Sequence, residues 1–146
     1  MPAYLYNELF LFFMEMPALL NSPPYMIGIA GGSASGKTSV AERIVALLGV
    51  SSVVLISMDS FYKPLTIAQT DAANANDYDF DHPNAFDYDL LFDILAELKS
   101  GRMVEVPRYC FQTHSRLETT TEIHGANVVI FEGILALFDD RVIHLF

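Results

Sequence analysis

A glycine-rich stretch carries the clearest chemical signal in this chain of 146 residues. Residues 31–38 read Gly-Gly-Ser-Ala-Ser-Gly-Lys-Thr and fit the phosphate-binding pattern G-x-x-x-x-G-K-[ST]. Glycines allow backbone N–H groups to converge on a phosphate, and the N-terminus of a following helix adds positive potential. Lys37 would reach the β- and γ-phosphates, and Thr38 would bind Mg²⁺. The predicted nucleotide-binding residues are Gly31, Gly32, Ser33, Ala34, Ser35, Gly36, Lys37, Thr38 and Ser39.

Two acidic residues follow apolar, strand-like segments. Asp59 comes shortly after residues 53–57 (VVLIS), and Glu132 directly follows residues 127–131 (NVVIF). The carboxyl ends of parallel strands meet at one edge of a sheet, so we expect both acids to face one crevice. Glu132 would hold Mg²⁺ or begin a helix. Asp59 would accept the proton of an acceptor hydroxyl or cap the next segment, and its position leaves both roles open.

The elements that position these residues alternate between strand and helix signals. An apolar run at 26–30 precedes the glycine-rich loop, and residues 37–48 follow it with helical periodicity. Residues 90–99 also have helical spacing, whereas 103–106 and 119–123 predict a hairpin. We therefore expect an α/β domain with a parallel sheet and flanking helices.

One acidic segment interrupts this pattern. Residues 71–93 hold seven aspartates and no Lys or Arg, so we expect the segment to begin as a solvated loop.

Composition narrows the class of protein. The net charge of -10 disfavours nucleic acid as a partner, because such binding depends on Lys and Arg. Cys110, the single cysteine, fits a reducing compartment such as the cytoplasm.

An apolar extension at 1–24 precedes the predicted domain at 25–146. Glu8 and Glu15 bracket its apolar run, which is shorter than the ~20 residues a membrane span needs. It also lacks the positive region of a secretory signal, so no membrane partner is expected. We interpret it as an amphipathic helix or a poorly ordered extension.

GTP is disfavoured as the nucleotide. A GTPase would normally carry an Asn-Lys-x-Asp motif, and no lysine of residues 25–146 follows an asparagine. A kinase instead needs a carboxylate beside the γ-phosphate, which Asp59 would supply.

Residues 26–146 resemble the N-terminal part of the uridine/cytidine kinase family, in its uridine kinase-like branch. The resemblance lies in GGSASGKT (31–38), SMDSFY (57–62), FDHPNAFD (80–87), PRYCFQTHSR (107–116) and FEGILA (131–136). It implies a P-loop NTPase fold with a β-hairpin insertion that binds nucleoside. The implied activity is ATP-dependent phosphorylation of uridine or cytidine to the monophosphate, in pyrimidine salvage.

The resemblance also implies roles for single residues. Asp59 would be the base on the nucleoside 5′-hydroxyl and Lys37 the second catalytic residue, with Thr38 and Glu132 at Mg²⁺. The implied substrate-binding residues are Asp81, Tyr109, Phe111, His114 and Arg116. Spacing alone would make Tyr109 and Phe111 one face of a strand, and His114 an exposed loop residue.

The chain departs from the family pattern at two positions and at its end. Cys110 stands where these kinases usually have an aspartate, and Asn84 replaces the usual second acid of the Asp-His-Pro segment. Family members continue beyond Phe146 into a further strand, an arginine-rich lid and more of the substrate site. We therefore expect a C-terminally truncated domain with strand 26–30 at an exposed edge, which residues 4–20 would cover.

Two other functions stay open. A catalytically inactive ATP-binding fragment would associate with full-length kinase subunits, and a homo-oligomer would be one form of such association. A related P-loop kinase would phosphorylate another hydroxyl compound, such as pantothenate or ribulose phosphate.

Overall fold

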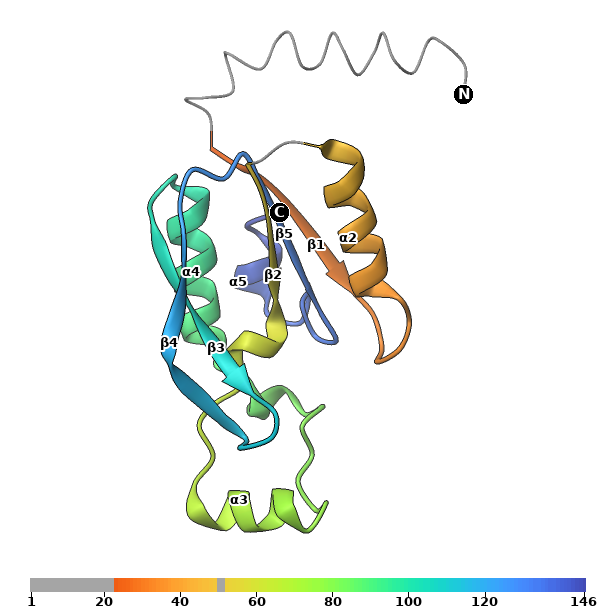
Figure 1. Ribbon diagram of the computed structural model, residues 1–146, viewed down its shortest axis with the longest axis vertical. Helices are drawn as coiled ribbons and strands as arrows, with labels where there is room; N and C mark the ends of the chain where they lie inside the picture. The colour runs from red at the N-terminus through yellow and green to blue at the C-terminus, as the bar shows by residue number, and fades with distance from the viewer. Residues whose placement is uncertain (1–22, 50–51) are drawn as a thin grey trace, which may run out of the picture.

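A parallel sheet forms the centre of the fold. The computed structural model describes residues 23–49 and 52–146 (Figure 1). Its sheet contains β1 (Tyr25–Ala30), β5 (Val128–Gly133) and β2 (Val53–Ser57), in that spatial order. Both β1 and β2 pair with β5 in parallel. The predicted α/β class and parallel sheet are confirmed.

Two long helices accompany the sheet (Figure 1). Helix α2 (Lys37–Leu48) packs on the three strands and ends at Gly49, whose positive φ of 60° suits a residue without Cβ. Helix α4 (Tyr88–Lys99) packs against the hairpin and buries Leu91, Leu95 and Leu98. These spacings place the three leucines on one helical face. A short helix, α5 (Asp140–Ile143), contacts α4.

The predicted hairpin is present, and both of its strands are longer than the sequence predicted. Strands β3 (Val104–Cys110) and β4 (Ser115–Ile123) pair antiparallel, with a register shift between Pro107 and Tyr109. Proline has no backbone N–H to donate, so the sequence predicted a strand that ends before Pro107. Each strand of a two-stranded ribbon is an edge strand, and edge strands tolerate proline. Val104, Val106 and Ile123 are buried beneath the ribbon.

The acidic segment begins differently from the expectation. Residues 71–74 belong to helix α3 (Ile67–Asn74), so the prediction of a loop starting at Asp71 was wrong. Thr66 and Gln69 form a capping box: the Thr66 hydroxyl accepts from the Gln69 N–H, and Gln69 Oε1 accepts from the Thr66 N–H at 2.9 Å. This cap stabilises a helix start that the charge pattern did not reveal. The loop follows α3 and contains a short 3₁₀ turn, η3 (Pro83–Ala85).

Strand β1 lies at an edge of the sheet, as predicted for residues 26–30. In the described part of the chain it pairs with β5 alone. The expectation that residues 4–20 cover this edge lies outside the described residues, as does most of the 1–24 extension. No described helix is long and apolar enough to cross a bilayer.

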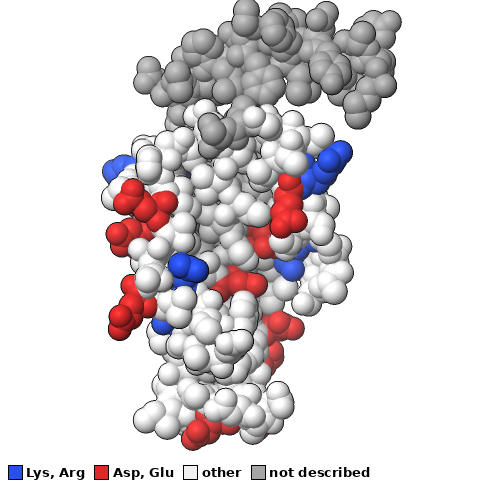
Figure 2. Space-filling model, in the orientation of Figure 1, with Lys and Arg blue, Asp and Glu red and all other residues white. Residues whose placement is uncertain are grey.

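Figure 2 shows acidic and basic side chains on one face in separate small patches, between wide neutral areas. Beneath the surface, large aromatic and aliphatic side chains form the core. Its largest fully buried members are Phe61, Phe86, Phe131, Met58, Leu91, Leu95, Ile130, Val129 and Val142.

Gly133 is required where β5 ends, because the chain after β2 comes very close to it. A Cβ at Gly133 would lie 2.3 Å from the Cβ of Met58, which is itself fully buried. The Cβ of Met58 is bonded directly to the backbone and cannot move aside as the end of a flexible side chain can, so only glycine permits this approach.

We expect Gly133→Ala to lower the free energy of unfolding by ~1–3 kcal/mol or more, through overpacking. Urea denaturation would measure this change. Gly32→Ala is the matched control, since nothing lies within 4 Å of a Cβ at that position. Equal stability of the two variants would contradict the close packing at Gly133.

Candidate phosphoryl-transfer site

The strand register brings the three predicted functional segments to one edge of the sheet. Glu132 in β5 is the register partner of Ser57 in β2 and of Ile29 in β1. Asp59 lies two residues beyond Ser57, and the glycine-rich loop begins two residues beyond Ile29. The loop, Asp59 and Glu132 therefore meet at the carboxyl ends of the strands, where α/β folds bind ligands.

The glycine-rich loop has the backbone that a phosphate requires. Gly36 has a φ of 87°, and no side chain caps the N-terminus of α2 that follows it. A Cβ at Gly31 would lie 2.8 Å from Ser35 Oγ, so a larger residue there would displace the Ser35 hydroxyl. The uncapped N–H groups of α2 are free to donate to an anion. The loop geometry fits a nucleotide phosphate.

Asp59 lies in a short 3₁₀ turn, η2 (Met58–Phe61), directly after β2. The cap of this turn is Ser57, whose hydroxyl accepts the N–H of Asp59 at 3.3 Å. The Asp59 carboxylate accepts no hydrogen bond from the described residues, which leaves it available for a ligand. Burial raises its pKa and the Glu132 carboxylate raises it further, whereas Lys37 lowers it.

Glu132 is the one buried charged side chain in the described part of the chain, with 4% of its surface exposed. Its Oε2 has no hydrogen-bond partner among the described residues. Because an unpaired buried carboxylate is costly, this oxygen is suited to bind a cation or a hydrogen-bond donor. No group of three or more acidic, His or Cys side chains is gathered for a metal within residues 23–49 and 52–146. Mg²⁺ held by Thr38, Glu132 and nucleotide phosphates fits such a sparse set.

Beside these acids lies an aromatic cluster, which we define as Tyr62, Phe80, Tyr109, Phe111 and His114. Tyr62 is its centre: the ring centroids lie 5.7 Å from Phe80, 5.0 Å from Tyr109 and 6.0 Å from Phe111. His114 stacks on Phe80 at 5.0 Å. The cluster thus joins η2 and the acidic loop to the hairpin.

Two polar atoms of this cluster have no partner in the described residues. The Tyr109 hydroxyl and His114 Nδ1 are both buried and unpaired. His114 also adopts a φ of 47°, which is uncommon for a residue with a side chain. Unpaired polar atoms among aromatic rings are suited to bind the edge of a planar, hydrogen-bonding ligand.

Asp81 lies close to the cluster, at its exposed side. Burial raises the pKa of Tyr62, and the carboxylates of Asp59 and Asp81 raise it further, in that order. The Tyr62 hydroxyl is therefore electrostatically coupled to both acids. The structure brings Tyr109 and Phe111 to Tyr62, and His114 to Phe80, which directly precedes Asp81. The role of these residues toward a nucleoside stays a prediction.

Arg116 is engaged with the protein itself. Its Nε donates to the Tyr62 carbonyl at 2.9 Å, and its Nη2 donates to Asp87 Oδ2 at 3.0 Å. Asp87 also caps α4 by accepting the Leu90 N–H at 3.3 Å. Arg116 thus connects the hairpin, the chain after η2 and the start of α4, and its role toward a substrate stays a prediction.

Sequence reasoning missed Tyr62 and Phe80 as single site residues, although both lie within the motifs that carry the resemblance. The available signal was an aromatic residue just after Asp59 and another just before Asp81. Their contacts to the hairpin join residues far apart in the chain, so periodicity alone did not reveal them.

The fold and the loop are those of the P-loop kinase class: a glycine-rich loop of the phosphate-binding type follows the first strand, and acids lie at the ends of two neighbouring strands. Residues 26–146 match the phosphoribulokinase/uridine kinase family, and the chain belongs to that family.

The chain is similar to three uridine kinases over most of its length. It is 54% identical over 121 residues to uridine-cytidine kinase-like 1 of Mus musculus, covering 83% of this chain and 22% of that protein. It is 53% identical to uridine-cytidine kinase A of Dictyostelium discoideum, with 82% and 23% covered. It is 52% identical to uridine kinase of Schizosaccharomyces pombe, with 82% and 27% covered. The chain therefore spans about a quarter of these relatives.

Solved structures share the fold at low sequence identity. A possible uridine kinase from Bacillus stearothermophilus has a TM-score of 0.62 at 17% identity, with 98% of this chain and 78% of that chain covered. Phosphoribulokinase from Rhodobacter spheroides has a TM-score of 0.57 at 13% identity, with 79% and 44% covered. The predicted P-loop kinase fold is confirmed.

The raised pKa of Asp59 predicts a pH-dependent stability. A folded-state pKa above the ordinary 3.8 means that the folded protein loses stability as pH rises through the raised value. Asp59→Asn cannot ionise, so its unfolding free energy should exceed that of the unchanged protein near neutral pH. This advantage should shrink as pH falls through the raised pKa.

Urea denaturation of both proteins at a series of pH values would measure the difference. Asp71→Asn, at an exposed position of α3, is the control and should show no such trend. A stability difference between Asp59→Asn and the unchanged protein that is constant with pH would contradict the electrostatic coupling.

Arg116→Gln should lower the free energy of unfolding by ~1.5–3 kcal/mol, because it removes a charge-assisted bond and leaves a carbonyl without its donor. The control is Arg102→Gln, whose ion pair with Glu97 is exposed at 64% and 44% of the two side chains and should contribute little. Differential scanning calorimetry would compare them. A loss no larger for Arg116→Gln than for Arg102→Gln would refute the connecting role.

Proposed function

We propose that the chain binds ATP with Mg²⁺ and transfers the γ-phosphoryl group to the 5′-hydroxyl of uridine or cytidine. The observation that carries this proposal is the position of Asp59. Its carboxylate is close enough to Lys37 and Glu132 for their charges to shift its pKa, and its own charge raises the pKa of Tyr62 in the aromatic cluster. A base between a phosphate site and a planar-ligand site is the arrangement that a nucleoside kinase needs.

The phosphates would lie on the loop of residues 31–38. Backbone N–H groups of the loop and of α2 would donate to phosphate oxygens, and Lys37 would neutralise charge on the β- and γ-phosphates. Thr38 and Glu132 would hold Mg²⁺, which supplies further neutralisation of the charge that develops during transfer. Ser39, which follows Thr38 in α2, would complete the nucleotide contacts.

The acceptor hydroxyl would lie against Asp59. Its oxygen forms a new bond to the γ-phosphorus while the bond to the β,γ-bridging oxygen breaks, so ADP leaves. The hydroxyl proton passes to the Asp59 carboxylate. Half-burial of Asp59 and its neighbour Glu132 make the carboxylate a stronger base than an exposed aspartate, which suits this step.

The pyrimidine would lie in the aromatic cluster. Phe80 and Phe111 supply ring faces, and the unpaired Tyr109 hydroxyl and His114 Nδ1 supply hydrogen bonds to the edge of the base. Asp81, near the exposed side of the cluster, would accept from ribose hydroxyls. Such a reaction belongs to pyrimidine salvage, with the cytoplasm as its compartment.

A second candidate is an ATP-binding fragment without turnover that associates with full-length kinase subunits, or with copies of itself. It is favoured by the open edge of β1 in the described residues, together with exposed apolar side chains at Tyr25, Val40 and Leu47. Unpaired edges and apolar patches are typical of surfaces that bind another chain.

The test is MgATP-dependent conversion of labelled uridine or cytidine to the monophosphate by the purified chain. Asp59→Asn should reduce the rate by ~10²–10⁴, because the general base is lost. Asp71→Asn should leave the rate unchanged, since Asp71 lies on the exposed α3. Pantothenate and ribulose phosphate serve as competing acceptors that should not be phosphorylated.

Equal rates for Asp59→Asn and the unchanged chain would refute the assignment of the base. A folded chain that binds ATP without forming product would favour the second candidate. In that case Lys37→Ala should weaken nucleotide binding with no turnover to lose.

A further inference from the structure

The turn that carries Asp59 is fixed at both of its ends by contacts from outside. At its start, Ser57 caps η2, and the fully buried Met58 lies against the end of β5. At its end, the carbonyl of the fully buried Phe61 accepts the N–H of Asp87 at 2.8 Å. A short 3₁₀ turn has poor hydrogen-bond geometry of its own. The position of η2 therefore depends on these outside contacts.

Arg116 supplies the side-chain contacts at the end of this turn. Its Nε donates to the Tyr62 carbonyl at 2.9 Å, and no other described group donates to that oxygen. Its Nη2 donates to Asp87 Oδ2 at 3.0 Å and lies 3.5 Å from the Phe61 carbonyl. The Arg116 and Asp87 side chains are only 20% and 28% exposed, so water screens this ion pair incompletely. One guanidinium thus contacts two consecutive carbonyls just beyond Asp59.

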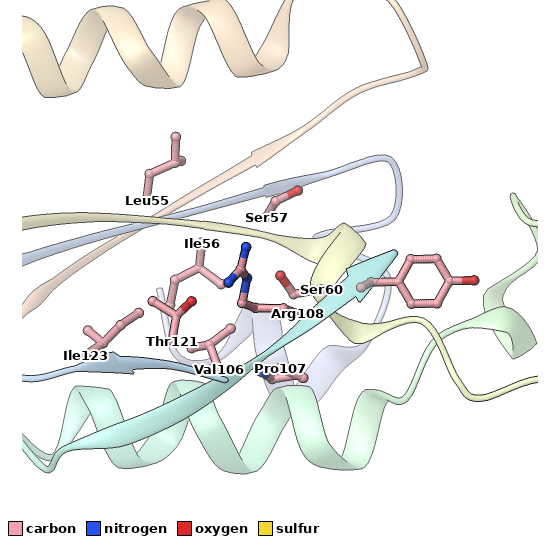
Figure 3. A pocket seen from close by; sticks show the side chains of 10 residues that line it. Leu55, Ile56, Ser57, Ser60, Val106, Pro107, Arg108, Thr121 and Ile123 are labelled. Atoms are coloured by element: carbon pink, nitrogen blue, oxygen red, sulfur yellow. The ribbon is translucent and has the colours of Figure 1, made fainter. Parts of the chain in front are cut away.

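Arg116 itself belongs to the hairpin that would hold the nucleoside. It is the register partner of Tyr109, whose ring lies 5.0 Å from the Tyr62 ring. Figure 3 shows strand β3 beside η2 and the end of β2, where Ser60 and Ser57 lie. A cavity of about 280 Å³ is lined by these segments and by both strands of the hairpin. The hairpin is therefore not packed tightly on the end of β2, and single side chains such as Arg116 and Tyr62 join the two.

These contacts favour a role for Arg116 other than binding a substrate. Two of its three guanidinium nitrogens already donate to the protein, and the Asp87 carboxylate balances its charge. Asp87 is fixed in turn, because it caps α4 by accepting the Leu90 N–H. A substrate contact through these nitrogens would have to break bonds that hold η2, the hairpin and α4 together.

We propose that Arg116 is a positioning residue, which fixes the turn of Asp59 relative to the hairpin and so aligns the candidate base with a nucleoside in the aromatic cluster. This role rests on the proposed function, in which Asp59 is the base. The acceptor hydroxyl must lie within hydrogen-bond reach of the base, and a displacement of about 1 Å can lower a rate by ~10²-fold. Arg116 acts through Asp59 and does not contact the reacting atoms.

Steady-state kinetics of uridine phosphorylation with MgATP would test this role. Arg116→Gln should lower kcat by roughly tenfold or more, because the base is misaligned. The KM for ATP should stay unchanged, because backbone pairing positions the phosphate loop. Arg116→Lys keeps the charge without the planar geometry and should recover part of the loss. Leu98→Val, near the other end of α4 from Asp87, is a stability control that should leave kcat unchanged.

Hydrogen exchange would measure the hold on the turn without turnover. Arg116→Gln should raise the exchange rates of the amides of residues 58–62 by roughly tenfold or more, because local opening becomes easier. Leu98→Val should not raise exchange selectively in this segment. If the unchanged chain formed no product, the proposed function would fail, whereas the exchange rates would still decide whether Arg116 holds the turn.

Unchanged exchange of residues 58–62 in the folded Arg116→Gln variant would overturn the proposal, as would an unchanged kcat in an active chain. A raised KM for uridine at unchanged kcat would assign Arg116 to substrate binding instead, and would overturn it too. Circular dichroism would verify folding. If Arg116→Gln does not fold, Arg116→Lys should show the same two changes to a smaller extent, and the absence of both would contradict the role.

Discussion

The pairing of β5 between β1 and β2 is the constraint on which the site depends. Each pairing fixes where one functional segment begins: the phosphate loop follows β1, Asp59 follows β2, and Glu132 ends β5 itself. Side chains alternate between the two faces of a strand, so a shift of one residue in either pairing would turn Glu132 away from its neighbours. The buried Met58 and Gly133, in close contact, hold this register where β5 meets the chain after β2.

A second set of contacts joins the hairpin to this framework. Arg116 reaches from β4 to the Tyr62 carbonyl and to Asp87, and Asp87 caps α4. The aromatic cluster also joins the hairpin to this framework, because Tyr62 contacts one ring from the acidic loop and another from the hairpin. The half of the site that would hold the nucleoside is therefore positioned by side chains, whereas the half that would hold phosphate is positioned by backbone pairing.

This difference explains what the sequence could predict. Strand 53–57 and helix 37–48 were predicted with the bounds that the structure shows, because a buried parallel strand and an amphipathic helix have local periodicity. The phosphate loop, Asp59 and Glu132 follow from their positions next to these elements.

The rest depends on contacts that local patterns do not contain. Arg116 bonds to partners 54 and 29 residues away in the chain, so its place in the structure could not be read from spacing. Helix α3 was missed because its aspartate and asparagine outweighed a capping box that is visible only when Thr66 and Gln69 are considered together. The β3–β4 ribbon was predicted too short because Pro107 obscured its continuation.

The central claim is that Glu132 and the phosphate loop form one site, at which Mg²⁺ joins the nucleotide to β5. The most direct measurement is the affinity of the chain for ATP with Mg²⁺ and with EDTA, in the unchanged protein and in Glu132→Gln. The account predicts that Mg²⁺ strengthens ATP binding to the unchanged protein and that this gain is largely lost in Glu132→Gln, while binding in EDTA persists. An equal gain from Mg²⁺ in both proteins, or no ATP binding by either, would contradict it.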